Sequence, residues 1–326
     1  MNTNRPIFLV GCPRSGTTLL STMLHAHPRI AMPPETRFLL PAYHDRATFG
    51  DLRDEANRLA LARRLTQGGS KFKDLGLNRR EVVDKIVAGP PTLGSAAGII
   101  WREFARSRGK VRWGEKRPAY WREMHVILRL FPDAQIIHLV RDGRACVASL
   151  KQVSWWDRGP IGSMTTWTLA DQKLRRLGRT LPSDAYHYLR YEDLLADPEG
   201  QLGALCRFLG EEFDEAMLDR SEAAADIVPT RKTWHDRVRG DLDPSRIEAW
   251  RTALTPSEIG LFERVAAREM RRNGYEPSGA GAKPGALGVA TYGKQYALRR
   301  ANIARERIKD ELLARREEQP VADQGD

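Results

Sequence analysis

The sequence predicts an α/β fold built on a mostly parallel central sheet. Two apolar runs, at residues 7–10 and 134–140, have the length of buried strands, and each is followed by a glycine-bearing turn and a segment with helical periodicity. Strands and helices alternate along most of the chain, as is typical of parallel sheets whose strands are joined by helices. We expect one main domain over residues 1–277, a flexible linker over 278–291 and a charged helical tail over 292–326.

The 326 residues carry a formal net charge of +11. This charge favours anionic partners such as a nucleotide, an acidic polymer or a membrane surface, and the alternative is an arginine-rich surface that is merely solvated. No basic stripe with interleaved aromatic residues is visible, so nucleic-acid binding is not expected. No run of about 18 apolar residues could span a membrane, and a strand already at residues 7–10 leaves no room for a signal peptide. We therefore expect a cytoplasmic protein without an integral membrane span.

Three cysteines, Cys12, Cys146 and Cys206, are widely spaced and odd in number. They suggest neither a disulfide framework nor a zinc site, and they fit a reducing compartment. Cys12 follows the first strand without an obvious histidine partner, so we interpret it as a small residue that fills the loop rather than a nucleophile. No cluster of His, Cys and carboxylates has the spacing of metal ligands, so no metal is expected.

The segment that follows the first strand has the features of an anion-binding loop. Gly11 and Gly16 have the spacing of a phosphate-binding loop, and the helix expected over residues 16–26 would point its N-terminal N–H groups at a bound anion. The lysine that serves the β- and γ-phosphates of ATP is missing, because Thr17 and Thr18 stand there and the nearest cation is Arg14. A glycine-rich turn without a ligand is the alternative interpretation.

The first helix ends at His27-Pro28, and two prolines stiffen the expected loop over residues 29–37 that carries Glu35. A helical insertion covers about residues 40–109, with Asn78 as a helix cap. Its helices are expected at residues 52–66, 81–88 and 93–107.

The second half of the main domain continues the alternation of strands and helices. Residues 222–243 lack clear periodicity and carry Arg231, Lys232, Arg237 and Arg239. The charged tail over 292–326 is either a solvated helix packed on its own domain or a contact for a subunit or acceptor. Strands are expected at 111–116, 134–141 and 186–191, and helices at 121–131, 144–151, 163–178, 199–210, within 245–273, and at 292–318.

Four stretches resemble the cofactor site of sulfotransferases that use 3′-phosphoadenosine 5′-phosphosulfate (PAPS), above all the tyrosyl-protein branch and its bacterial relatives. They are residues 13–20 with His27-Pro28, the segment Glu35-Thr36-Arg37, the segment 115–118 (Glu-Lys-Arg-Pro), and residues 139–149. The resemblance implies a P-loop-like three-layer sandwich, PAPS as co-substrate and sulfuryl transfer to a hydroxyl group.

The resemblance also implies a role for each site residue. Transfer requires a base for the acceptor hydroxyl and positive donors for the equatorial oxygens and the leaving phosphate. The catalytic residues would be Glu35 as base, Lys116 facing the sulfate and Arg14 on the equatorial oxygens, with Arg37 on an acidic acceptor. The residues implied to bind PAPS are Pro13, Arg14, Ser15, Gly16, Thr17, Thr18, Arg141, Ser149 and Tyr191, of which Arg141 and Ser149 match the pair that binds the 3′-phosphate.

Alternatives remain for the residues and for the function. Arg141 could instead pair with Asp142 or Glu192, Tyr191 could be a core residue, and Glu35 could be a surface glutamate paired with Arg37 or Arg14. The chain also departs from the tyrosyl-protein enzymes, since a proline precedes Glu35. A P-loop kinase and a non-catalytic nucleotide-binding protein are the competing functions. The acceptor stays open between a tyrosyl peptide, a glycan, a lipid and a small molecule, and a homodimer is possible.

Overall fold

The computed structural model describes residues 4–67, 71–228, 243, 247–315 and 320–325. Arg231, Lys232, Arg237 and Arg239 lie outside this part of the chain.

A five-stranded parallel sheet forms the centre of the molecule, which confirms the predicted α/β fold. The strand order is β2-β3-β1-β4-β5, so β1 lies between β3 and β4, and every strand pair is parallel. Leu9 of β1 is in register with the last residue of β3, Lys116. The strands are β1 (Ile7–Gly11), β2 (Ile30–Ala31), β3 (Arg112–Lys116), β4 (Gln135–Val140) and β5 (Tyr186–Arg190).

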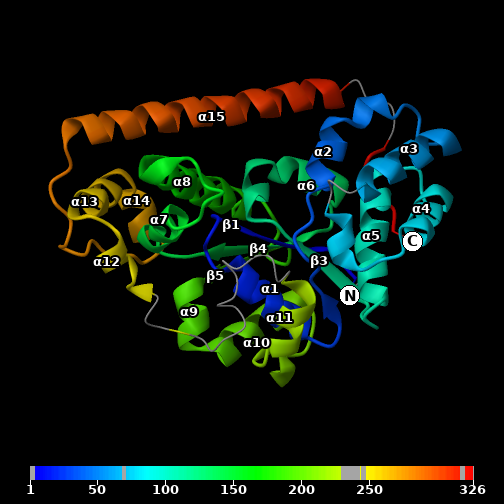
Figure 1. The fold of residues 1–326 in the computed structure, drawn as a ribbon, viewed down its shortest axis with the longest axis horizontal. Coiled ribbons are helices and arrows are strands. Elements are labelled where there is room, and N and C mark those ends of the chain that lie inside the picture. The colour runs from blue at the N-terminus through cyan, green and yellow to red at the C-terminus, as the bar shows by residue number, and fades with distance from the viewer. Residues whose placement is uncertain (1–3, 68–70, 229–242, 244–246, 316–319, 326) are drawn as a thin grey trace.

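Helices cover both faces of the sheet in three layers (Figure 1). One face is covered by α1, α9, α10 and α11, the other by α6, α7 and α8, and α15 lies across this second layer. The helices of these layers are α1 (Thr17–Ala26), α6 (Met124–Leu130), α7 (Gly143–Lys151), α8 (Gly159–Gly178), α9 (Tyr191–Ala196), α10 (Pro198–Leu209), α11 (Ser221–Ile227) and α15 (Ala286–Ala314). Three shorter helices, α12 (Trp250–Ala253), α13 (Pro256–Val265) and α14 (Ala267–Arg272), pack beside α7 and α8.

The helical insertion packs against the β2–β3 side of the sheet through α5. Trp101 of α5 stacks on Trp113 of β3, with ring centroids 4.9 Å apart, and meets Phe8 of β1 edge-on at 6.1 Å. This buried aromatic cluster holds together the two strands whose ends carry the anion-binding loop and Lys116. The insertion contains α2 (Leu39–His44), η1 (Arg46–Thr48), α3 (Glu55–Thr66), η3 (Phe72–Leu75), α4 (Arg79–Ala88) and α5 (Leu93–Arg106), and the remaining 3-10 helices are η4 (Pro118–Arg122) and η5 (Glu215–Met217).

Several short elements differ from the sequence prediction. The expected loop over residues 29–37 contains β2, which is only two residues long and therefore carries no periodicity. The expected helix over 121–131 is split into η4 and α6, and α9 begins directly after β5 where a loop was expected. Asn78 caps α4 as predicted, because its side chain accepts from the N–H groups of Arg80 and Glu81.

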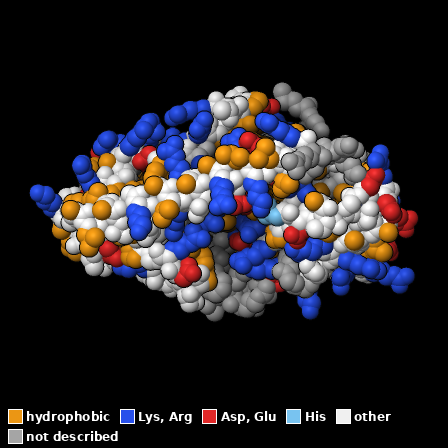
Figure 2. All heavy atoms as spheres, turned by 90° about the horizontal axis from the view of Figure 1, so that it is seen from above, with side chains coloured by type: hydrophobic (Ala, Val, Ile, Leu, Met, Phe, Trp, Pro, Cys, Tyr) orange, Lys and Arg blue, Asp and Glu red, His pale blue; other side chains and the backbone are white. Residues whose placement is uncertain are grey.

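The C-terminal helix starts earlier than the predicted residue 292, at Ala286, and it packs on the main domain. Its Tyr292 and Tyr296 donate their hydroxyls to Thr168 and Gln172 of α8 at 3.0 and 2.7 Å. Figure 2 shows the face that carries α15, with Lys and Arg side chains on both sides of the helix. The end of the chain returns to α5, where Asp323 forms an ion pair with Arg102 at 2.8 Å.

Candidate functional site

The loop between β1 and α1 has a backbone conformation that presents N–H groups to an anion. Ser15 donates its N–H to the carbonyl of Cys12 at 3.1 Å, and Arg14 and Gly16 have positive φ values of 73° and 97°. Gly16 is the N-cap of α1 and offers no side chain to cap it, so the first N–H groups of α1 are directed out of the helix. The helix dipole adds positive potential at this point. The buried hydroxyl of Ser15 has no hydrogen-bond partner among the described residues.

Tyr191 and Arg141 contact this loop from the ends of β4 and β5. A Cβ atom placed on Gly16 would lie 2.3 Å from Cδ2 of Tyr191, so only glycine leaves room for the ring. The guanidinium of Arg141 lies over the same ring, with Cζ 4.5 Å from the ring centroid. Its Nη1 donates to the carbonyl of Arg14 at 3.4 Å. The predicted residues of the two strand ends therefore meet at the anion-binding loop.

The acidic residues proposed as competing partners of Arg141 make other contacts. Asp142 forms an ion pair with Arg144 at 2.7 Å. Glu192 accepts the backbone N–H of Asp142 at 2.9 Å and the hydroxyl of Tyr275 at 2.7 Å. Both carboxylates are thus already engaged in holding the turn after β4.

Ser149 of α7 also reaches the loop. Arg14 Nε donates to Ser149 Oγ at 2.9 Å, which joins residues that are 135 positions apart in the chain. Ser149 therefore contacts the side chain of Arg14, and Arg141 contacts its carbonyl, so both residues expected to bind a 3′-phosphate meet at Arg14. Arg14 bonds Ser149 through Nε, and its predicted role on the equatorial oxygens of a sulfate stays a prediction.

Glu35, Lys116 and Thr18 form the second part of the site. Lys116 Nζ donates to Glu35 Oε2 at 3.2 Å and to Thr18 Oγ1 at 3.4 Å. The lysine is 4% exposed, and it is the last residue of β3, next to the strand that carries the loop. Arg37 Nε lies 3.9 Å from Glu35 Oε1, and its side chain is 56% exposed. Glu35 is therefore held between a buried lysine and an arginine at the surface.

A second carboxylate, that of Glu115, was not singled out from the sequence. It is fully buried, and its Oε1 accepts the N–H of Thr36 at 3.3 Å and the hydroxyl of Thr36 at 2.8 Å. Burial raises the pKa of Glu115 to about 8, and the neighbouring charge of Glu35 adds to this shift. Strand alternation was the available signal, because side chains of adjacent residues point to opposite faces: if Lys116 faces the loop, Glu115 faces the other side of the sheet.

Pro13 and Cys12 complete the loop. Pro13 is half-buried, and Cys12 is a buried free thiol beside Cys146 of α7. Burial raises the pKa of Cys12 well above its usual value, which disfavours the thiolate. This environment agrees with the interpretation of Cys12 as a residue that fills the loop.

Within the described residues, no group of three His, Cys, Asp or Glu side chains comes close enough to hold a metal ion. In the same part of the chain, no helix has the length and apolar character needed to cross a lipid bilayer.

Two models of known protein families match this chain. A family model described as "Sulfotransferase family" matches residues 6–215, which include every residue named above for the loop, Glu35, Lys116, Arg141, Ser149 and Tyr191. A second model, described as "Sulfotransferase domain", matches residues 161–274. The chain belongs to the sulfotransferase family.

Individual relatives are distant in sequence. The chain is 28% identical over 297 residues to nodulation protein NoeE of Sinorhizobium fredii (strain NBRC 101917 / NGR234), covering 83% of this chain and 66% of NoeE, just under two thirds of that protein. It is 27% identical over 287 residues to protein-tyrosine sulfotransferase 1 of Danio rerio, covering 83% of this chain and 72% of the relative.

Two solved structures share the fold. The sulfotransferase domain from the Synechococcus PCC 7002 olefin synthase matches with a TM-score of 0.56 and 26% identity, over 81% of this chain and 95% of that domain. The sulfotransferase domain from the curacin biosynthetic pathway matches with a TM-score of 0.57 and 22% identity, over 84% of this chain and 99% of that domain. The three-layer P-loop-like architecture expected from the sequence agrees with these neighbours.

Proposed function

We propose that this protein transfers a sulfuryl group from PAPS to a hydroxyl acceptor, with Glu35 as the base. The main support is the position of Lys116, whose ammonium lies within 3.2 Å of Glu35 and 3.4 Å of Thr18. A base, a buried cation and the first turn of α1 therefore lie at one point of the sheet. PAPS supplies an activated sulfuryl group on a phosphate that can leave.

The anion-binding loop holds the 5′-phosphate end of the nucleotide in this proposal. Backbone N–H groups at Gly16 and Thr17 and the hydroxyls of Ser15 and Thr18 donate to it, while Pro13 shapes the turn. The buried Ser15 hydroxyl, which no described residue accepts from or donates to, fits this task because a buried polar group without a partner is costly. A bound phosphate oxygen would satisfy it.

The 3′-phosphate is proposed to bind between Arg141 and Ser149. Arg141 is held against the ring of Tyr191 and donates to the carbonyl of Arg14, and Ser149 accepts from the side chain of Arg14. Two arginines and one serine hydroxyl are thus already linked before any ligand is present. Such preorganisation lowers the entropic cost of binding a second phosphate. The site therefore favours a nucleotide with two separate anionic groups.

The acceptor hydroxyl loses its proton to the carboxylate of Glu35 in this scheme. Lys116 stays beside the reacting oxygens and offsets the negative charge that develops on them. Arg37, at the exposed side of Glu35, is placed to contact the acceptor.

Calorimetry and turnover test the proposal together. We expect the product 3′-phosphoadenosine 5′-phosphate (PAP) to bind more tightly than 5′-AMP or ATP, and radiolabelled PAPS to transfer its label to members of a library of hydroxyl acceptors. Tighter binding of ATP would favour a kinase, and tight PAP binding without transfer to any class of acceptor would favour a non-catalytic nucleotide-binding protein.

A further inference from the structure

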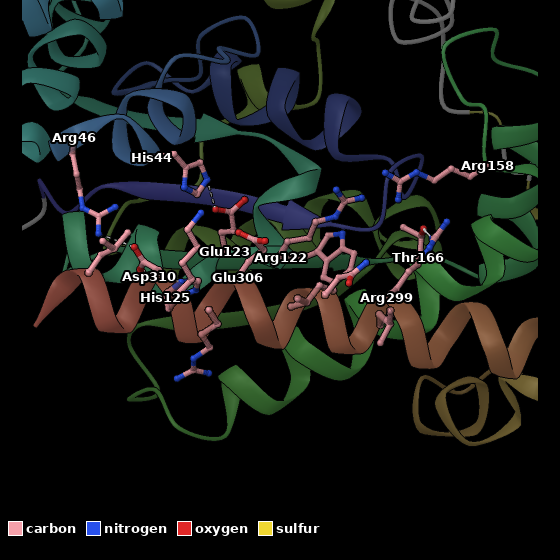
Figure 3. Close-up of a pocket in the computed structure, with 17 residues that line it drawn as sticks. His44, Arg46, Arg122, Glu123, His125, Arg158, Thr166, Arg299, Glu306 and Asp310 are labelled. Carbon is pink, nitrogen blue, oxygen red and sulfur yellow. Dashed lines mark hydrogen bonds and ion pairs between the residues drawn. The ribbon is translucent and has the colours of Figure 1, made fainter. Parts of the chain in front are cut away.

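A cavity of about 460 Å³ lies between α15 and the main domain (Figure 3). Its size falls in the range of sites for small organic ligands. Apolar side chains form part of its wall, namely Trp121, Leu169, Ile303 and Leu313. Its remaining walls come from α2, η1, η4, α6, α8 and α15.

At one end of this cavity the charges are balanced. Asp310 pairs with Arg46 at 2.9 Å and with His125 at 3.4 Å, and Glu123 pairs with His44 at 2.8 Å. Figure 3 shows these residues grouped together at the end near α2. These pairs cancel much of the charge at this end, and α15 adds Glu306, Arg307 and Lys309 to the lining of the cavity.

The opposite end carries three arginines, Arg122, Arg158 and Arg299, and among the described residues no carboxylate lies within ion-pair distance of any of them. Arg299 is held in place because its Nη1 donates to the carbonyl of Gly162 and the hydroxyl of Thr166, both at 2.7 Å. Gly162 lies against two of the arginines. A Cβ atom there would lie 2.8 Å from Arg158 Cβ and 2.9 Å from Arg299 Nη2.

These like charges act on one another. Burial lowers the pKa of Arg299 to about 10, and the positive charges of Arg158 and Arg122 contribute to the shift. Three guanidinium groups face one cavity, and the carboxylates that line it with them, Glu123, Glu306 and Asp310, form no ion pair with any of the three. The three cations therefore repel each other, and a bound anion lowers that cost. Arginine is suited to the task, because its planar fork matches carboxylates and phosphates in a bidentate manner.

The arginine end is also the end near the anion-binding loop. Arg122 is the last residue of η4, which begins two residues after Lys116, and its charge acts on the thiol of Cys12 in the loop. In Figure 3 the Arg122 side chain lies beside the tip of β1. Arg122 therefore links this end of the cavity to the anion-binding loop and to the segment that follows Lys116.

We propose that the arginines 122, 158 and 299 bind an acidic group of the acceptor, so that the acceptor is a small hydroxyl compound that also carries a carboxylate or a phosphate. This inference rests on the proposed function, because it treats the cavity as part of the acceptor site. The charged group would occupy the arginine end, and an apolar body would pack on Trp121 and its neighbours.

Calorimetry on the full chain saturated with PAP provides the first test. The probes are 3-(4-hydroxyphenyl)propanoate, the phosphonate with the same hydroxyphenyl group, and the neutral amide of the propanoate. We expect both acids to bind at least about tenfold more tightly than the amide. The acid that binds more tightly shows whether the site prefers a carboxylate or a phosphate-like group. Equal affinity of acids and amide, or no binding of either acid, overturns the proposal.

Two variants locate the binding. Arg158→Gln and Arg299→Gln are each expected to lower the affinity for the acids by about ten- to a hundredfold, the usual effect of losing a charge-assisted hydrogen bond. The affinity for the amide should not change. Arg158 is exposed, so its variant should fold normally, whereas Arg299→Gln also removes the bonds to α8. Arg300→Gln, an exposed neighbour on α15, is the matched control and should bind like the wild type. Unchanged acid binding in both cavity variants contradicts the assignment.

Turnover separates this inference from the proposed function. With radiolabelled PAPS, Arg158→Gln should raise the KM for acidic acceptors and leave kcat nearly unchanged. If the wild type uses neutral phenols as efficiently as the acids, the result supports the proposed sulfotransferase activity and contradicts the proposal of an acidic acceptor. If PAP does not bind and no label is transferred, the proposed function falls instead, and acid binding measured without PAP still decides whether the arginines form an anion site.

Discussion

Thr36 donates both its N–H and its hydroxyl to one carboxylate oxygen of Glu115, at 3.3 and 2.8 Å. Thr36 follows Glu35 directly, and Glu115 precedes Lys116, so each partner of the Glu35–Lys116 pair is next to a residue of this buried contact. The contact therefore fixes the backbone at both functional residues. It also places a titratable group under the site.

The stability of the protein should depend on the protonation of Glu115. Burial raises its pKa in the folded state to about 8 from an ordinary 4.5, so the folded protein holds a proton that the unfolded chain has already released. The stabilisation is complete below about pH 4.5 and is lost as the pH rises to about 8. Glu115→Gln, which has no such proton, should lose less free energy of unfolding over this range, as measured by urea denaturation from pH 5 to 9.

The comparison between variants isolates this one group. Asp171 also has a pKa raised by burial, to about 6, so the wild-type profile alone does not identify Glu115. Glu222→Gln replaces an exposed glutamate and should keep the wild-type pH profile. Parallel profiles for wild type and Glu115→Gln would show that Glu115 does not hold its proton in the folded state.

Arg141→Ala should lower the affinity for PAP far more than the affinity for 5′-AMP. The guanidinium lies over Tyr191 and is proposed to read the 3′-phosphate, and a lost charge-assisted hydrogen bond costs about 1.5–3 kcal/mol, or roughly ten- to a hundredfold in affinity. Arg179→Ala, at an exposed arginine after α8, is the control and should change neither affinity. Equal weakening of PAP and 5′-AMP in calorimetry would remove Arg141 from the 3′-phosphate role.

Gly16→Ala should destabilise the loop for two separable reasons. The φ of 97° costs about 1–2 kcal/mol for a residue with a Cβ atom, and that atom would lie 2.3 Å from the Tyr191 ring. Thermal unfolding should occur at a lower temperature, and PAP affinity should fall. Tyr191→Ala removes the clash but not the strain, and it also leaves a cavity because Tyr191 is buried. Gly16→Ala should therefore cost less free energy of unfolding in a Tyr191→Ala background than in the wild type. A single variant as stable as the wild type would show that the ring moves aside freely.

The sequence was sufficient to predict the main strands and helices, because β1 and β4 are continuous apolar runs followed by glycine turns. The strand order was not predictable. The neighbours of β1 are β3 and β4, which lie more than 100 positions further along the chain, and no local pattern encodes that pairing. The two residues of β2 are held by pairing with β3 rather than by their own sequence.

The structure brings together several residues that motifs in the sequence single out, and their roles stay predictions. The contacts Arg14–Ser149 and Lys116–Glu35 join stretches that the resemblance had already singled out. Glu115 was missed because its burial depends on which elements cover β3, and its partner Thr36 is 79 positions away. The arginine end of the cavity was missed for the same reason, since Arg299 is half-buried only because α15 packs on α8.

The proposed base is tested by Glu35→Gln. The amide keeps the size of the side chain and its capacity to accept a hydrogen bond from Lys116, which the carboxylate accepts at 3.2 Å, but it cannot take up a proton at the pH of the reaction. PAP binding should persist, because none of the groups proposed to hold either phosphate is altered. The thermal unfolding temperature should change little, because the amide has the same shape and still accepts a hydrogen bond from the Lys116 ammonium.

Turnover of Glu35→Gln should fall by ~100- to 10,000-fold, the usual contribution of a general base. Arg37→Gln is the matched control, because it removes the exposed arginine 3.9 Å from Glu35 and leaves the carboxylate in place. It should raise the KM for an acidic acceptor more than it lowers kcat. Single-turnover measurements with radiolabelled PAPS separate the chemical step from acceptor binding. Near wild-type transfer by Glu35→Gln would show that another group takes the proton, and the pH profile of the remaining activity would then report the pKa of that group.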